Sequence, residues 1–207
     1  MSELIAALIL AAGESSRMRE GSDMVVLKPL LPYRGNTVLG HLVETIQSAG
    51  IPQVGVVLGY QAENILPSLY KYSLPVIINR SYPLGMLSSI QCGLKHLSTH
   101  LDPPPQAYLI CLGDQPGLQP ETFKQILALA PLNHKSILIA SFENRKGHPI
   151  LIPAGYVEEI LSIPPEKGLR ELMQRHPDKV TLIPLTDSWI TRDMDTPDDY
   201  RKALEEI

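Results

Sequence analysis

The chain has 207 residues, of which 44% are apolar and 19% charged, a balance typical of a globular protein and not of a disordered or fibrous one. Its net charge of −4, with both signs interspersed, argues against a nucleic-acid-binding protein. The longest apolar run, Leu4 to Ala12, is far shorter than the roughly 20 residues that span a bilayer. We expect one domain, with no signal peptide or membrane segment, and a cytoplasmic location in which Cys92 and Cys111 stay reduced.

Short apolar runs alternate along the chain with segments of helical period, the pattern of parallel strands joined by crossover helices. The runs predict six strands: Leu4 to Leu10, Val54 to Leu58, Val76 to Ile78, Ala107 to Leu112, Ile137 to Ala140 and Val180 to Ile183. The run Pro149 to Ile152 predicts an added strand that is either antiparallel or at an edge. The fold class is therefore α/β with a mostly parallel sheet.

Caps and apolar periodicity predict helices between these strands. Thr37 is a typical N-cap, and Gly50 supplies the left-handed stop of the same helix. A second helix, Met86 to Leu101, carries its apolar residues on one stripe. Pro197 opens the last helix, where its missing N–H donor costs nothing.

A loop of small residues follows the first predicted strand, at the end of the sheet where open α/β folds bind ligands. It reads Ala11-Ala12-Gly13-Glu14-Ser15-Ser16-Arg17. Small side chains let backbone amides approach an anion, Gly13 can adopt a positive φ, and Arg17 and Lys28 add two cations. The alternative is an ordinary tight turn, since the chain holds neither G-x-G-x-x-G nor G-x-x-x-x-G-K-[ST].

Carboxylates follow a second predicted strand and precede the last helix. Asp114, in Gly113-Asp114-Gln115-Pro116, suits Mg²⁺, which takes one or two carboxylates with water and phosphate; the alternative is a cap of the helix near Pro120. The segment Asp193 to Asp199 holds four aspartates and offers a second acid. There the alternative is capping by Thr196 or Asp195.

Histidines and cysteines add weaker indications. His148, in a predicted loop, either orients a substrate or bonds to backbone. Cys92, His96 and His100 recur every four residues on one helix, but the ends of that ladder are about 12 Å apart, too far for one metal ion. H-E-x-x-H, C-x-x-C and G-x-S-x-G are absent from the sequence.

Taken together, these motifs resemble those of the MobA-like nucleotidyltransferases, most closely the molybdenum cofactor cytidylyltransferases. The resemblance spans nearly the whole chain. The motifs that carry it are Leu10-Ala11-Ala12-Gly13 through Arg17-Met18 and Lys28; Gly59-Tyr60; Asn79, Gly85 and Ser88-Ser89; Gly113 to Pro116; Gly147 to Pro149; Gly168 with Arg170; and Asp193 to Pro197.

The resemblance implies a Rossmann-like three-layer sandwich of the GT-A type, one domain over residues 1–207. It also implies binding of a nucleoside triphosphate, CTP favoured, with Mg²⁺ as cofactor and a phosphorylated acceptor such as molybdopterin, and a molybdoenzyme as a further partner. By the same resemblance, the nucleotide lies over Leu10, Ala11, Ala12 and Gly13, Lys28 and Arg17 bind its phosphates, and Asp114 and Asp195 hold the metal. The resemblance also implies that Asn79, Gly85 and Ser88 lie near the base or acceptor. His148 and Arg170 are expected near the acceptor.

One departure from the resemblance concerns the first loop. Arg19 to Val26 lengthens it, so that Lys28 comes 11 positions after Arg17, and Leu27 stands where a proline often precedes the lysine. The leading hypothesis is transfer of a nucleotidyl group with release of pyrophosphate. Two alternatives are a non-catalytic protein that holds a pterin cofactor for delivery, and an NAD(P)H-dependent oxidoreductase, against which the missing G-x-G-x-x-G argues.

Overall fold

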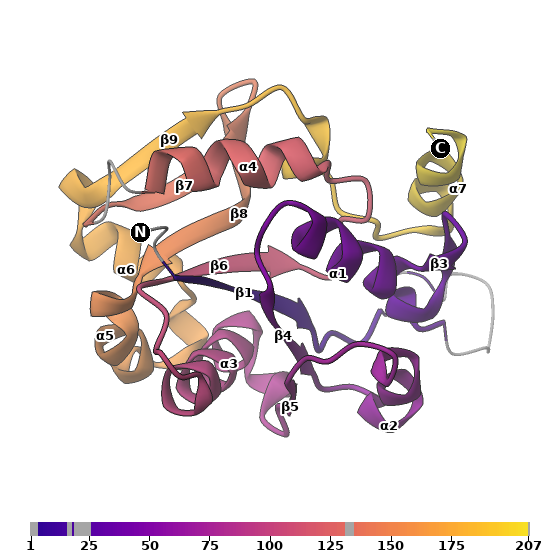
Figure 1. Cartoon of the computed structure of the whole chain (residues 1–207), viewed down its shortest axis with the longest axis horizontal. Coiled ribbons are helices and arrows are strands. Elements are labelled where there is room, and N and C mark those ends of the chain that lie inside the picture. Colours follow the sequence, from indigo (N-terminus) through magenta and orange to yellow (C-terminus); the bar gives the residue numbers. More distant parts are fainter. Residues whose placement is uncertain (1–3, 16–17, 19–25, 131–134, 207) are drawn as a thin grey trace.

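A seven-stranded sheet runs through the molecule in the order β5-β4-β1-β6-β8-β7-β9 (Figure 1). The computed structural model describes residues 4–15, 18, 26–130 and 135–206. The strands of the sheet are β1 (Ile5–Ala11), β4 (Gln53–Leu58), β5 (Val76–Ile78), β6 (Ala107–Leu112), β7 (Ile137–Phe142), β8 (Arg145–Pro153) and β9 (Val180–Pro184). Two short strands, β2 (Pro32–Tyr33) and β3 (Asn36–Thr37), pair separately as a hairpin.

The six predicted strands are confirmed to within two residues of their ends. The apolar run Pro149 to Ile152 lies in β8, which pairs antiparallel with both β6 and β7, whereas the other pairs of the sheet are parallel. The antiparallel expectation is thus confirmed and the edge expectation is wrong. The reason is a tight turn at Glu143 and Asn144, both at positive φ, which folds β8 back between β7 and β6.

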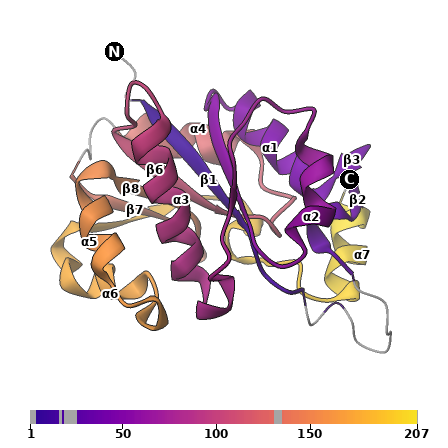
Figure 2. The same ribbon diagram turned by 90° about the horizontal axis from the view of Figure 1, so that it is seen from below.

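Helices cover both faces of the sheet (Figure 2). Their bounds are α1 (Val38–Ser48), α2 (Ala62–Ile65), α3 (Met86–His100), α4 (Pro120–Leu129), α5 (Val157–Ser162), α6 (Arg170–Arg175) and α7 (Pro197–Glu205). Alternate residues of β1 contribute to two separate cores, one with α1 and α4 and the other with α3, α5 and α6. This confirms the three-layer α/β sandwich.

The predicted helix ends have clear physical causes. Thr37 Oγ1 accepts a hydrogen bond from Gly40 N at 3.0 Å and so starts α1, which Gly50 follows at a φ of +96°. Pro197 is the first residue of α7, behind a capping box of Thr196 and Asp199. No helix among the described residues combines the length and the apolar character needed to cross a membrane.

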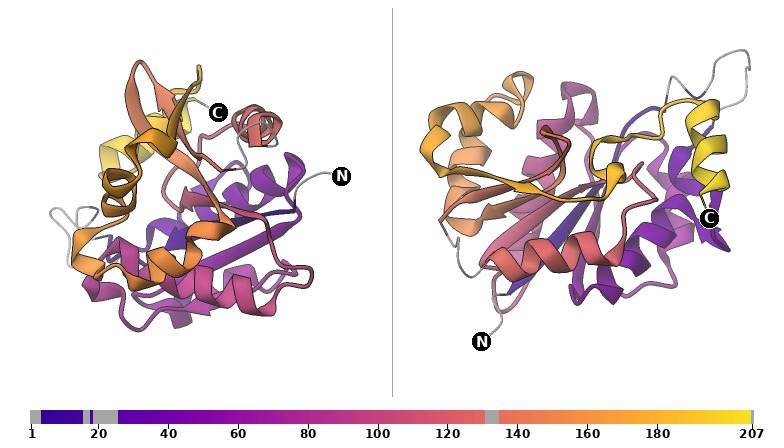
Figure 3. Two further views of the ribbon diagram at one scale, coloured as in Figure 1. Left: turned by 90° about the vertical axis from the view of Figure 1, so that its left-hand side faces the viewer. Right: turned by 90° about the horizontal axis from the view of Figure 1, so that it is seen from above.

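The topology brings several chain segments to one edge of the sheet. The carboxyl ends of the parallel strands β1, β4 and β6 meet there, and the start of β8 reaches the same edge because β8 is antiparallel. The helix α7 lies near the β2–β3 hairpin (Figure 3), where the Tyr200 hydroxyl donates to Pro32 O at 2.6 Å. This contact holds α7, and with it the preceding segment that carries Asp193 and Asp195, close to the carboxyl ends of the parallel strands.

Candidate active site

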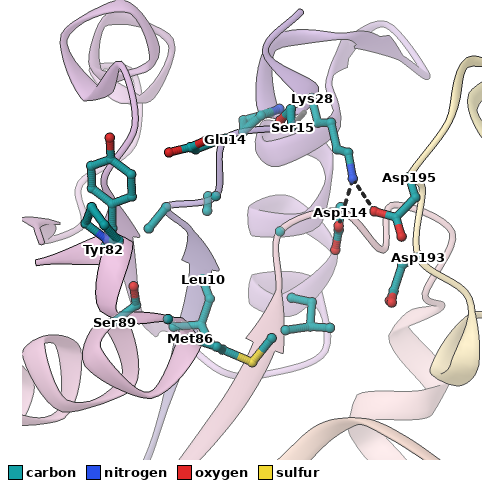
Figure 4. Close-up of a pocket in the computed structure, with 18 residues that line it drawn as sticks. Leu10, Glu14, Ser15, Lys28, Tyr82, Met86, Ser89, Asp114, Asp193 and Asp195 are labelled. Carbon is teal, nitrogen blue, oxygen red and sulfur yellow. Dashed lines mark hydrogen bonds and ion pairs between the residues drawn. The ribbon is translucent and has the colours of Figure 1, made fainter. Parts of the chain in front are cut away.

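A cavity of about 450 Å³ opens at the carboxyl ends of β1 and β6, a size that suits a small-molecule ligand (Figure 4). Its lining residues come from five stretches of the chain. They are Leu10, Ala11, Ala12, Gly13, Glu14 and Ser15; Lys28 and Pro29; Tyr82, Pro83, Gly85, Met86 and Ser89; Leu112, Gly113 and Asp114; and Asp193 and Asp195.

The loop after β1 forms one wall of this cavity. A Cβ added to Gly13 would meet nothing within 4 Å, so the glycine leaves room on the side of the loop. The expectation that Gly13 supplies a positive φ is wrong: in the described part of the loop the left-handed residue is Ser15, at a φ of 52°. The reason is that the chain turns later than predicted, where Met18 N donates to Ser15 O at 3.1 Å.

Lys28 joins two carboxylates that are far apart in the sequence (Figure 4). Its Nζ lies 2.6 Å from Asp195 Oδ1 and 3.3 Å from Asp114 Oδ2, and only 9% of the lysine side chain is exposed. Burial raises the pKa of the Asp114 carboxyl, the nearby Lys28 opposes that rise, and the carboxylates of Asp193 and Asp195 add to it. The structure thus places Lys28, Asp114 and Asp195 in one charged cluster.

The alternative roles of Asp114 and Asp195 as helix N-caps are taken by other residues. The N-cap of α4 is Gln119, whose backbone N–H donates to Asp187 Oδ2 at 3.0 Å. The N-cap of α7 is Thr196, which confirms one of the two capping residues expected there, and its hydroxyl donates to Asp199 Oδ2 at 2.7 Å. Neither Asp114 nor Asp195 is therefore needed to start a helix.

The two carboxylates fit a magnesium ion. Each offers hard oxygen atoms, and the two are close enough to share one ammonium group. In the described part of the chain no three His, Cys, Asp or Glu side chains group closely enough to hold a metal by themselves. Mg²⁺ commonly completes its coordination with water and phosphate oxygens, so the donor set suits an ion that arrives with a nucleotide.

The segment before α3 forms the opposite, more apolar wall. Tyr82, Gly85 and Met86 line the cavity, and Gly85 has a φ of 101° that lets the chain enter the helix. Asn79 and Ser88 do not line it. Both are buried, and Asn79 Nδ2 donates to Ser88 Oγ at 2.9 Å and to Ser89 Oγ at 3.0 Å.

Sequence reasoning therefore missed several lining residues. Of the pair Ser88-Ser89, it is Ser89 that faces the cavity, a choice that depends on the rotation of α3. Asp193 belongs to the acidic segment already singled out, and its Oδ1 accepts a hydrogen bond from Gln115 Nε2 at 3.1 Å. Tyr82 carries no sequence signal of its own.

Three other predicted residues lie elsewhere. His148 is in β8, so its assignment to a loop is wrong, because the hairpin extends the strand beyond the apolar run. It is half-buried, does not line the cavity, and burial lowers its pKa from 6.5 to about 4, which keeps the imidazole neutral at pH 7. Arg170 is exposed at the start of α6. Arg17 lies outside the described residues, as do residues 19–25 of the lengthened loop.

Comparison with known proteins gives matches along the whole chain. The sequence matches the family described as MobA-like NTP transferase domain over residues 7–180. It is 29% identical to nicotine blue oxidoreductase of Paenarthrobacter nicotinovorans, over 97% of this chain and 96% of that protein.

Solved structures match over a similar extent. The crystal structure of Rv0371c of Mycobacterium tuberculosis in complex with manganese has a TM-score of 0.77 and 27% identity, covering 98% of this chain and 99% of that one. A nucleotidyl transferase from Methanothermobacter has a TM-score of 0.82 and 22% identity, covering 98% and 97% of the two chains. The latter similarity shows a shared nucleotidyltransferase-type fold.

Proposed function

Because this chain belongs to the MobA-like NTP transferase family, we propose that it is a nucleotidyltransferase. It transfers a nucleoside monophosphate from a nucleoside triphosphate, CTP favoured, to a phosphorylated acceptor such as molybdopterin, and it releases pyrophosphate. The observation that carries the proposal is the cluster of Lys28, Asp114 and Asp195 beside the loop after β1. This arrangement puts a cation, two acids suited to bind a metal ion and a wall of small residues around one cavity.

The reaction is a displacement at phosphorus. A phosphate oxygen of the acceptor attacks the α-phosphorus of the triphosphate, a new P–O bond forms, and the bond to the bridging oxygen of the β-phosphate breaks as pyrophosphate leaves. The enzyme contributes mainly by orienting the reactants and by neutralising charge, so no side-chain nucleophile is needed. The small residues Ala11, Ala12 and Gly13 let the triphosphate approach the backbone.

Charged residues stabilise the developing negative charge. Lys28 and Arg17 neutralise negative charge on the α-phosphate and on the leaving pyrophosphate. Asp114 and Asp195 would hold Mg²⁺, which when bound supplies charge neutralisation at phosphate oxygens. The manganese complex of Rv0371c, 27% identical over 98% of this chain, supports a divalent cation here.

The remaining assignments follow the family resemblance and the position of each residue. Leu10 and Gly85 line the cavity. Asn79 and Ser88 are buried behind it, and their hydrogen bonds stabilise the turn before α3. Tyr82 and Met86 add an apolar surface beside Gly85 that suits a base or a flat acceptor. His148 and Arg170 contact an acceptor that extends beyond the cavity.

A second candidate function is an NAD(P)H-dependent oxidoreductase. The similarity to nicotine blue oxidoreductase over 97% of this chain favours it. A cofactor-delivery protein without catalysis is the third hypothesis. The three differ in ligand: a triphosphate with a divalent cation, a reduced nicotinamide, or a pterin without metal.

The test is thermal unfolding of the protein with CTP, GTP, ATP, UTP, dTTP, NADH and NADPH, each with and without Mg²⁺. A ligand present at 100 times its Kd adds about 2.7 kcal/mol, which raises the midpoint by a few degrees in a chain of this length. We expect a rise that needs Mg²⁺ with one triphosphate, followed by pyrophosphate release when an acceptor is supplied. A rise with a reduced nicotinamide alone would refute the transferase proposal.

A further inference from the structure

Lys28 binds the same carboxylate oxygens that a metal ion would bind. The carboxylates of Asp114 and Asp195 both accept hydrogen bonds from its Nζ, and they are the two acids assigned above to the metal. A divalent cation that binds these carboxylates competes with the ammonium group for the same oxygens. Two cations held side by side in a partly buried site also repel each other strongly, since water screens them poorly there.

The lysine cannot simply be left without an anionic partner. Its side chain is 9% exposed, and a buried ammonium group that loses its partners is strongly destabilising. Lys28 lines the same cavity as Gly13 and Ser15, on the wall where the triphosphate is placed. A lysine has a flexible four-carbon stem, so its Nζ can move between acceptors that lie on one cavity wall.

Resting on the function proposed above, we propose that Lys28 couples metal binding to triphosphate binding by moving from Asp114 and Asp195 to a phosphate oxygen. In the nucleotide-free protein the ammonium holds the two carboxylates and opposes a divalent cation. When a triphosphate binds, it gives Lys28 another anionic partner and leaves both carboxylates to the metal. The exchange keeps the ammonium group of Lys28 paired with an anion at each stage.

The charge of the cavity makes this coupling reciprocal. Among the described lining residues, Lys28 is the one cation, and four carboxylates face the same space, those of Glu14, Asp114, Asp193 and Asp195. A divalent cation bound at Asp114 and Asp195 lowers the negative charge that a triphosphate meets on this wall. By linkage, the factor by which the triphosphate raises metal affinity is the factor by which the metal raises triphosphate affinity.

The test measures metal affinity without any nucleotide or activity. Lys28→Met removes the positive charge and keeps most of the length of the side chain. Binding of Mn²⁺ alone to wild type and variant is followed by electron paramagnetic resonance of the free ion. We expect the variant to bind Mn²⁺ more tightly, by a factor in the range of about 5 to 150 that is usual for coupled sites.

The control is Lys124→Met, which makes the same change of charge at an exposed lysine of α4 that pairs with Glu121 at 3.2 Å. Its Mn²⁺ affinity should equal that of the wild type. Adding Asp195→Asn to Lys28→Met should abolish the gain, which would locate the tighter site at these carboxylates. If Lys28→Met does not fold, as judged by circular dichroism, Lys28→Gln replaces it in the same measurement.

An unchanged or weaker Mn²⁺ affinity in the folded Lys28 variant, or a gain that survives Asp195→Asn, would overturn the coupling. The proposed function fails in a different way. It fails if no triphosphate stabilises the wild type in the thermal panel, whatever the lysine does to Mn²⁺ binding. A protein that releases pyrophosphate but shows no gain in Mn²⁺ affinity would retain the function and lose the coupling.

Discussion

The carboxyl group of Asp114 illustrates, at the scale of one residue, a conflict between stability and function. Burial raises its pKa, and the attraction of Lys28 does not fully offset this. A carboxyl group whose pKa is raised by folding binds protons better in the folded state, so its contribution to stability falls as the pH rises through that pKa. In its ionised form the group therefore lowers the stability of the fold, a cost consistent with the metal-binding role proposed for it.

Asp114→Asn is expected to separate these two effects. The rate of pyrophosphate release should fall by a factor of about 10² or more, because the amide is a poor metal ligand and carries no charge. The thermal midpoint should be no lower than that of the wild type, because the variant has no carboxylate to desolvate. Asp178→Asn, which removes an exposed carboxylate, serves as the control. Near-normal turnover in Asp114→Asn would exclude the metal role.

His148 gives a prediction for the pH dependence of stability. Burial lowers its pKa from 6.5 to about 4, so between these values the unfolded chain binds a proton that the folded protein does not. The folded state should therefore lose stability as the pH falls from about 6.5 towards 4, by up to about 3 kcal/mol from this group.

Urea unfolding at pH 7.0, 5.5 and 4.5 measures this loss. His148→Gln should reduce the difference in unfolding free energy between pH 7.0 and 4.5, because glutamine does not titrate. Gln125→Ala, at an exposed position of α4 that does not titrate, is the control and should leave the difference unchanged. Parallel pH curves for wild type and His148→Gln would show that the imidazole does not differ between the folded and unfolded states.

At the scale of elements, a close contact joins the loop after β6 to the segment before α7. A Cβ at Gly117 would lie 2.0 Å from Cε2 of Trp189, so only glycine fits there. Trp189 belongs to a short 3-10 helix, Ser188–Thr191, and its Nε1 donates to Glu206 Oε2 at 3.0 Å. This packing fixes the stretch from which Asp193 and Asp195 reach the cavity.

Gly117→Ala should therefore destabilise the protein by about 1–3 kcal/mol, the usual effect of overpacking a tight contact. Trp189 is the one tryptophan of the chain, so its fluorescence should change in the folded variant as the ring is displaced. Denaturant unfolding and emission spectra measure both effects. Gly155→Ala, where a Cβ would meet nothing within 4 Å, is the control. Equal stability of the two variants would mean that the ring moves aside without loss of packing.

At the scale of the whole molecule, the sheet joins the two halves of the sequence. β6, the first strand of the second half, pairs along its length with β1 from the first half. The charged cluster is divided in the same way, with Lys28 in the first half and Asp114 and Asp195 in the second. We infer that neither half forms the sheet or the site without the other.

This arrangement predicts one cooperative unfolding transition. In urea, Trp189 fluorescence reports the C-terminal region, and far-UV circular dichroism reports all helices and strands. The two signals should change together at the same midpoint, as in two-state unfolding. Refolding by dilution controls for reversibility. Separate midpoints would show that the chain unfolds as two independent parts, contrary to the single domain expected from the sequence.

The sequence by itself determined the features that depend on near neighbours. Apolar runs predicted six strands of the sheet, and the central ones are apolar throughout because their side chains are buried on both faces. Thr37 and Pro197 predicted the starts of α1 and α7, because capping acts over three or four residues. The family resemblance also singled out Lys28, Asp114 and Asp195 as site residues.

Only the tertiary structure decided what depends on distant parts of the chain. It put β8 inside the sheet, turned Ser89 towards the cavity in place of Ser88, and gave Ser15 the positive φ expected of Gly13. It also joined Lys28 to carboxylates 86 and 167 positions away, a contact on which the coupling of metal and triphosphate rests. Local pattern cannot supply such pairings, because strand order and helix rotation are set by packing of the whole core.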